Sequence, residues 1–248
     1  MIVTTEAFVL HGRKFRDSSK ILSFYTREDG MISCIAKGAR MPKNKFGSSL
    51  QPLSFSQISY YKKPTSDLFL LSKSETIEAM NGIINSYEKL NIGLAVLESL
   101  SLTQIQHEPN EEIFFLIKDV LTALNKADEN FYNYFVKFQL DLYKIIGYSI
   151  SFSYFDLDKT TKSDFYKLEF HTGEFGEGRL SNGGFTLNAK TAGYLKQINA
   201  TPVDALSSVW LDNSLVKAMN TMFAMYIGYH LDKKIKFKTL EFYTENDL

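Results

Sequence analysis

The sequence contains a single cysteine, Cys34, among 248 residues. One thiol cannot close an internal disulfide or supply a multi-cysteine metal site, so a secreted disulfide scaffold and a zinc ribbon are excluded. The four histidines are far apart and lack the close ligand spacings of common metal motifs: His11, His107, His171 and His230. We therefore expect a protein that folds without a metal and without a cofactor.

Long apolar runs are also missing. No stretch approaches the about 18 residues that a membrane-spanning helix requires. The N-terminus MIVTTEAFVL lacks the basic region and the small-residue cleavage site of a secretory signal. Hydrophobic residues nevertheless make up 44% of the chain and aromatic residues 14%, which is ample material for a dry core. The sequence predicts a folded, soluble, cytoplasmic protein.

The common signatures of phosphate-binding loops, catalytic nucleophiles and zinc proteases are absent: G-x-x-x-x-G-K-[ST], G-x-G-x-x-G, G-x-S-x-G and H-E-x-x-H. Two pairs of acids occur, but Glu111-Glu112 suits a helix N-terminus and Asp156/Asp158 suits a solvated turn. We expect no catalytic residue and no enzyme activity.

The formal net charge of zero conceals an uneven distribution. Residues 1–75 carry 12 basic and 6 acidic side chains, whereas residues 76–148 carry 5 and 10. Because local surface potential attracts phosphates, this pattern favours a polyanion-binding module joined to an acidic scaffold. The alternative is that the charges only solvate separate faces.

Residues 1–75 show the pattern of a small β-barrel. Short apolar runs alternate with turn chemistry such as Asp29-Gly30, Gly38, Pro42, Gly47 and Pro64. Five strands are expected, around residues 7–10, 21–25, 31–36, 53–61 and 68–71. A change of alternation phase at Ser56-Gln57 predicts a bulge in the fourth strand. Five short strands suit a closed oligonucleotide-binding (OB) barrel.

From about Thr76 the apolar period changes from two to near 3.6, which predicts a helical domain over residues 76–248. Amphipathic stripes run through residues 90–100, 113–124, 131–145, 189–198 and 215–229. Asn110 is placed to cap the second of these helices. Gly147 ends the third, and residues 148–187 are expected to form hairpins or an ordered insertion. The fold class is therefore α+β.

One segment is unusually rich in basic residues. Four cations occur within nine positions of a Gly/Pro-rich connection between expected strands: Lys37, Arg40, Lys43 and Lys45. A second cluster lies upstream: Arg13, Lys14, Arg16 and Lys20. OB-folds bind nucleic acid with such loops while aromatic side chains stack on bases. Aromatic residues available for stacking are Phe24, Tyr25, Phe46, Phe55, Tyr60 and Tyr61. The alternative is a solvated loop with most of these aromatics in the core.

The order of these residues resembles the RecO family of bacterial DNA repair proteins. The similarity lies in Arg13–Leu22, Phe24–Ser33, Lys37–Arg40, Pro42-Lys43, Phe46-Gly47 and Leu50–Leu53. Tyr229–Phe242 is similar to the closing helix and tail of that family. Many members carry a four-cysteine zinc module after a Gly-Tyr pair. Here residues 148–187, after Gly147, contain no cysteine, so zinc binding does not carry over. Apolar and aromatic packing is expected to hold this segment together instead, among Phe152, Tyr154, Phe155, Phe165, Tyr166, Phe170 and Phe175.

The resemblance implies a DNA repair and recombination mediator in the cytoplasm, associated with the nucleoid. Such a protein binds single- and double-stranded DNA, anneals complementary strands, and works with RecR to load RecA onto DNA coated with single-strand-binding protein. It also implies that the helical domain receives the acidic, hydrophobic tail of that protein in a basic-rimmed apolar groove. Candidate rim residues are Lys118, Lys137 and Lys144. The alternative function is a non-repair RNA-binding or regulatory OB-fold protein.

Overall fold

The computed structural model describes residues 1–153, 164–178 and 183–241. Contacts between residues divide the chain into two units, Met1–Asn125 and Lys126–Leu248, which we call unit 1 and unit 2. The division into an OB-fold domain of residues 1–75 and a helical domain of residues 76–248 stays a prediction.

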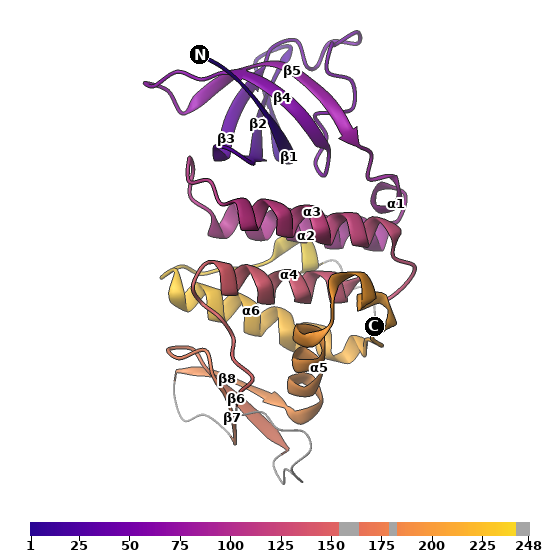
Figure 1. Ribbon diagram of the computed structural model, residues 1–248, viewed down its shortest axis with the longest axis vertical. Coiled ribbons are helices and arrows are strands. Elements are labelled where there is room, and N and C mark those ends of the chain that lie inside the picture. The colour runs from indigo at the N-terminus through magenta and orange to yellow at the C-terminus, as the bar shows by residue number, and fades with distance from the viewer. Residues whose placement is uncertain (154–163, 179–182, 242–248) are drawn as a thin grey trace. The chain divides into compact units, whose positions relative to one another are not determined.

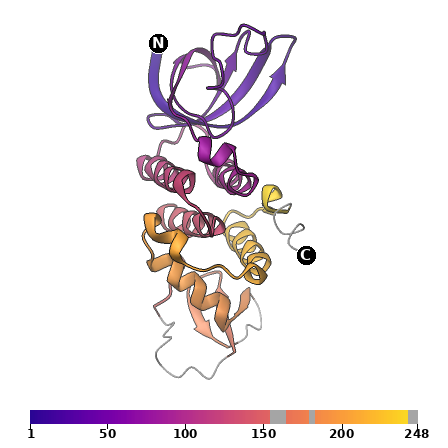
Figure 2. The same ribbon diagram turned by 90° about the vertical axis from the view of Figure 1, so that its right-hand side faces the viewer.

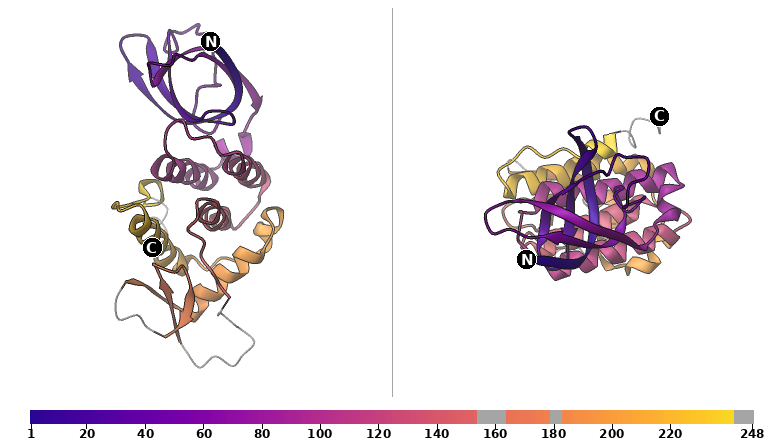
Figure 3. Two further views of the ribbon diagram at one scale, coloured as in Figure 1. Left: turned by 60° about the vertical axis from the view of Figure 1, so that its left-hand side comes forward. Right: turned by 90° about the horizontal axis from the view of Figure 1, so that it is seen from above.

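Unit 1 begins with five strands that close into a barrel in the order β1-β2-β3-β5-β4 (Figures 1 and 3). The strands are β1 (Ile2–Phe15), β2 (Ser19–Thr26), β3 (Gly30–Ala36), β4 (Phe55–Tyr61) and β5 (Leu68–Glu78). β3 and β5 pair in parallel, and the other neighbours are antiparallel. The barrel and the α+β class are confirmed. β4 shifts register against β5 between Phe55 and Ser56, next to the position expected for a bulge.

The alternation of apolar residues builds the barrel interior. Leu22, Phe24, Ile32, Cys34 and Tyr60 are all buried in one cluster. When the sheet closes, these side chains fill the barrel interior, because the interior of a small barrel is formed by the inward-facing residues of every strand.

The turn between β2 and β3 depends on a glycine. Gly30 has a φ of +62°, a conformation that other residues rarely adopt. A Cβ atom at this position would lie 2.3 Å from the backbone oxygen of Glu108. The turn therefore packs directly against the segment that precedes helix α3 (Glu111–Lys126).

Three helices complete unit 1: α1 (Asn81–Ile84), α2 (Tyr87–Thr103) and α3 (Glu111–Lys126). Figures 1 and 2 show α2 and α3 side by side. The expected cap is present, since Asn110 Oδ1 accepts a hydrogen bond from the backbone N of Ile113 at 3.1 Å. The Phe114 ring of α3 lies 5.7 Å from that of Phe8, and this contact packs the helix against β1.

The described part of unit 2 contains three helices: α4 (Tyr132–Ile145), α5 (Ala189–Ala200) and α6 (Val216–His230). Short 3-10 helices occupy Val203–Ser208, Asn213–Leu215 and Lys238–Leu240. Aromatic rings join α4 to α6, and Phe223 lies 6.3 Å from Phe135 and 5.9 Å from Tyr143. The helical periods read from the sequence are therefore helices in the structure.

A three-stranded sheet in the order β7-β6-β8 occupies the segment after Gly147. Its strands are β6 (Phe165–Glu169), β7 (Phe175–Glu177) and β8 (Gly184–Asn188). The Phe152 and Phe175 rings stack at 5.1 Å, and Tyr166 and Phe170 are buried. Of the aromatics expected to hold this segment together, Tyr154 and Phe155 lie outside the described residues.

Candidate nucleic-acid interface

The two basic clusters expected from the sequence meet at one end of the barrel. The first cluster lies on the end of β1, the β1–β2 turn and the start of β2, and the second lies on the loop after β3. Lys20 pairs in register with Ala36, the last residue of β3. The backbone N of Arg40 then donates to the Ser18 oxygen at 2.9 Å. We call this surface the basic end; it is formed by Arg13, Lys14, Arg16, Lys20, Lys37, Arg40, Lys43 and Lys45.

Arg40 ties the two loops together through its side chain as well. Its Nη1 atom donates to the backbone oxygens of Arg16 and Asp17, each at 3.0 Å. A guanidinium is suited to this task because it presents several donors in a fixed plane. Arg40 therefore contributes an exposed positive charge, and its hydrogen bonds also position the β1–β2 turn.

The long loop between β3 and β4 is folded against the barrel. Phe46 and Leu50 are buried in its core. Asn44 Oδ1 accepts hydrogen bonds from the backbone N atoms of Phe46 and Gly47, both at 3.0 Å. Lys45 Nζ donates to the Ser72 oxygen at 2.6 Å. These contacts hold the loop in one shape and leave its cations at the surface.

The charges of the basic end are not neutralised by carboxylates. Seven of its eight cations are exposed and Lys20 is half-buried. Within the described residues none of the eight forms an ion pair with a carboxylate; Asp17 is the acid that shares their turn.

Two cations at the opposite end of the barrel, Arg27 and Lys62, have acidic partners, whereas the exposed Lys63 forms no ion pair within the described residues. Arg27, in the β2–β3 turn, pairs with Glu111. Lys62, after β4, pairs with Asp29, which also accepts a hydrogen bond from the Tyr60 hydroxyl. Positive potential that no carboxylate compensates is thus concentrated at the basic end, and this potential attracts an anion there.

The interpretation of the aromatic residues as a stacking platform is wrong for five of the six. Phe24, Phe46 and Tyr60 lie in the barrel core. Tyr25 and Phe55 are also buried, because the helical part of unit 1 covers them: the Tyr25 hydroxyl reaches the Asn110 oxygen at 3.5 Å, and Phe114 lies 6.3 Å from Phe55. Tyr61, which is 41% exposed, stays available to a base.

The three candidate rim lysines fall on two helices in different units. Lys118 is on α3 in unit 1, with its Nζ atom 5.0 Å from the centre of the Phe55 ring. Lys137 and Lys144 are both on α4 in unit 2. Lys137 Nζ donates to the Asn199 oxygen at 2.9 Å and lies 3.4 Å from Asp141, whereas Lys144 is exposed. Their role as a rim stays a prediction.

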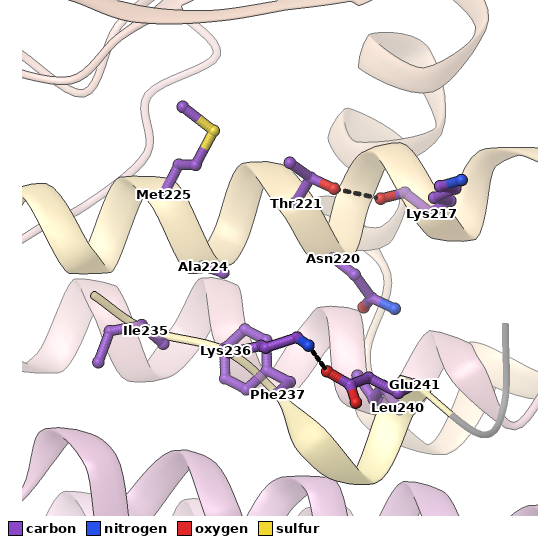
Figure 4. A pocket seen from close by; sticks show the side chains of 10 residues that line it. All are labelled: Lys217, Asn220, Thr221, Ala224, Met225, Ile235, Lys236, Phe237, Leu240 and Glu241. Atoms are coloured by element: carbon purple, nitrogen blue, oxygen red, sulfur yellow. Dashed lines mark hydrogen bonds and ion pairs between the residues drawn. The ribbon is translucent and has the colours of Figure 1, made fainter.

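Unit 2 holds a groove of about 350 Å³, and none of the three candidate rim lysines lines it. It lies between α6 and residues 235–241 (Figure 4). Its walls are largely apolar, with Lys217 on α6 and Lys236 on the facing segment. One wall of the groove could have been predicted from the alternation of charged and apolar residues in Lys234–Lys238. This alternation places lysines on the outside and Ile235 and Phe237 against the protein.

No cluster of three or more His, Cys, Asp or Glu residues able to hold a metal occurs in the described ranges 1–153, 164–178 and 183–241. Cys34 is buried in the barrel core, and this burial raises the pKa of its thiol to about 12. In the same ranges, no helix combines the length and the apolar character needed to cross a membrane.

Two family models cover almost the whole chain. The model described as Recombination protein O N terminal matches residues 1–80, and that described as Recombination protein O C terminal matches residues 84–239. The DNA repair protein RecO of Salinibacter ruber is 31% identical over 183 residues, which span 74% of this chain and 66% of that protein. Proteins of the same name from Chloroherpeton thalassium and Alkaliphilus metalliredigens are 23% and 24% identical, and these alignments cover at least 97% of each chain. The chain therefore belongs to the RecO family.

Proposed function

We propose that this protein is a DNA repair and recombination mediator of the nucleoid that binds single- and double-stranded DNA and anneals complementary strands. The observation that supports this is the asymmetry of the barrel. Eight cations gather at one end without carboxylate partners in the described residues, while Arg27 and Lys62 at the other end are paired. Such a surface suits a polyanion that lies across the basic end.

The chemistry of annealing fits this surface. Two strands repel each other because both carry a charge on every phosphate, and cations that neutralise phosphates lower this repulsion. No bond is made or broken, so the proposed activity needs no nucleophile, general base or metal. We therefore propose a mediator and not an enzyme.

The partners follow from family membership and are part of the proposal. We propose that the protein works with RecR, binds the acidic C-terminal tail of single-strand-binding protein, and thereby helps load RecA. For the tail we retain Lys118, Lys137 and Lys144 as candidate contacts. Lys144 is the most accessible of them, since Lys137 already has a carbonyl and a carboxylate as partners.

A strand-annealing assay on DNA coated with single-strand-binding protein tests the proposal. Two complementary labelled strands are mixed with and without this protein, and we expect faster pairing in its presence. The informative variant is Lys37→Ala/Lys43→Ala, with Lys62→Ala/Lys63→Ala as a control that removes the same charge from the opposite end of the barrel. Absence of annealing by the wild-type protein would refute the proposal, and a strong preference for RNA would favour the RNA-binding alternative.

A further inference from the structure

A second cationic surface lies in unit 2, where the chain leaves α6. Lys234, Lys236 and Lys238 are exposed, while Ile235 is half-buried and Phe237 is buried between them. The Phe237 ring meets that of Phe135 edge-on at 5.4 Å. Burial of alternate side chains holds the segment against the protein and points its lysines outward.

The start of this segment is fixed by the end of α6. The backbone N of Lys233 donates to the Gly228 oxygen at 3.0 Å, and that of Asp232 donates to the Tyr229 oxygen at 3.4 Å. A Cβ atom on Gly228 would lie 2.6 Å from the Lys233 oxygen, so the close approach requires glycine. We call Lys233, Lys234, Lys236 and Lys238 the lysine row.

The lysine row meets the groove described above at Lys236, which lines it (Figure 4). The apolar wall of the groove is formed by Ala224, Met225, Ile235, Phe237 and Leu240. Lys217 adds a cation from α6, and Glu241 is the acid on the other wall, paired with Lys236. Lys233 and Lys234 make no ion pair within the described residues.

We propose that the lysine row and this groove bind a second single strand of nucleic acid, with phosphates on the lysines and a base in the groove. Several cations in succession match a ligand whose charges repeat. Alternate side chains of extended backbone are about 6.6 Å apart, which is comparable to the separation of successive phosphates in a stretched strand. Lys234 and Lys236 are alternate residues that precede the 3-10 helix beginning at Lys238. A base has an apolar face and polar edges, and the groove combines apolar walls with the polar side chains of Asn220 and Thr221.

This inference rests on the proposed annealing function, because a protein that pairs two strands benefits from a site for each. A protein with the basic end as its one DNA site would bind one strand, so the second site adds a separate prediction. One protein molecule should bind two strands, and loss of the lysine row should leave one strand bound.

The test compares two double variants of the full chain. Lys233→Ala/Lys234→Ala removes two charges from the row, and Lys126→Ala/Lys190→Ala removes two exposed charges elsewhere in unit 2. Native mass spectrometry with an oligothymidine counts strands per protein, and the annealing assay measures pairing. We expect two strands for the wild type and the control but one for the row variant, with slower annealing. Two strands on the row variant would overturn the inference.

Cross-linking locates the second strand. An oligothymidine containing 4-thiothymidine is irradiated with the wild-type protein, and we expect cross-linked peptides from residues 217–241. Cross-links confined to residues 1–125 would overturn the inference and leave the proposed function intact. Binding of a synthetic acidic, phenylalanine-ended peptide that is lost in the row variant, with strand count unchanged, would assign the groove to a protein partner instead. A wild-type protein that binds no strand would refute both proposals.

Discussion

Replacement of the four loop cations by alanine should change how DNA binding responds to salt. The variant is Lys37→Ala/Arg40→Ala/Lys43→Ala/Lys45→Ala. Each cation that neutralises a phosphate of a single strand contributes about −0.7 to the slope of log affinity against log salt, so the four together should flatten the slope by about 3 units if each meets a phosphate. Base preference should scarcely change, because phosphate contacts position a strand without reading it.

Two of the four cations contribute charge alone, whereas Arg40 also contributes to the stability of the fold. Lys37 and Lys43 make no side-chain hydrogen bond or ion pair within the described part of the chain. Their double replacement should flatten the slope by about 1.4 units and leave stability unchanged. Arg40→Ala also removes two hydrogen bonds that hold the β1–β2 turn, so it should cost about 1 kcal/mol of unfolding free energy.

Fluorescence anisotropy with a labelled oligothymidine, repeated over a range of salt concentrations, measures the slope. Circular dichroism checks that each variant is folded. Lys62→Ala/Lys63→Ala is the matched control, because Lys62 already pairs with Asp29 at the opposite end of the barrel. A folded quadruple variant with the wild-type slope would refute the reasoning and move the DNA site elsewhere.

Three further predictions concern metal, partner and fold. Chelation should not lower the melting temperature; one equivalent of tightly bound zinc, with unfolding on chelation, would contradict this. Charge reversal at Lys118, Lys137 and Lys144 should abolish binding of the single-strand-binding protein tail, and unchanged affinity would remove these residues as candidates. Gly30→Ala should lower the free energy of unfolding in urea by about 1–3 kcal/mol, because its Cβ would meet the Glu108 oxygen. Gly47→Ala, with a φ of +56° but open space around it, should cost less.

Much of the fold could be predicted because local patterns decide it. Alternation and turn residues located all five strands of the barrel, and the 3.6 period located α2 to α6. The Asn110 cap followed from its place before an apolar stripe. The four-residue helix α1 could not be predicted, since Asn81–Ile84 is too short to show a period.

The composition of the site could be predicted better than its geometry. The two basic clusters are visible in the sequence, but their meeting depends on the register of Lys20 with Ala36 and on the hydrogen bonds of Arg40. Those are tertiary contacts between separate segments of the chain. The groove beside the lysine row is equally a product of packing, because Ile235 and Phe237 acquire their partners only when the segment folds back on α6.

The burial of the aromatic residues has a consequence for how a strand would be held. Alternation assigns Phe24 and Tyr60 to a face of the sheet, but only the closed barrel makes that face an interior. With Tyr61 as the exposed member of the set, the basic end offers many contacts to phosphates and little stacking to bases. A protein that binds a strand through its bases must release those bases before they can pair with a second strand. A grip on phosphates leaves the base edges free to meet a complementary strand, which is what annealing of arbitrary sequences requires.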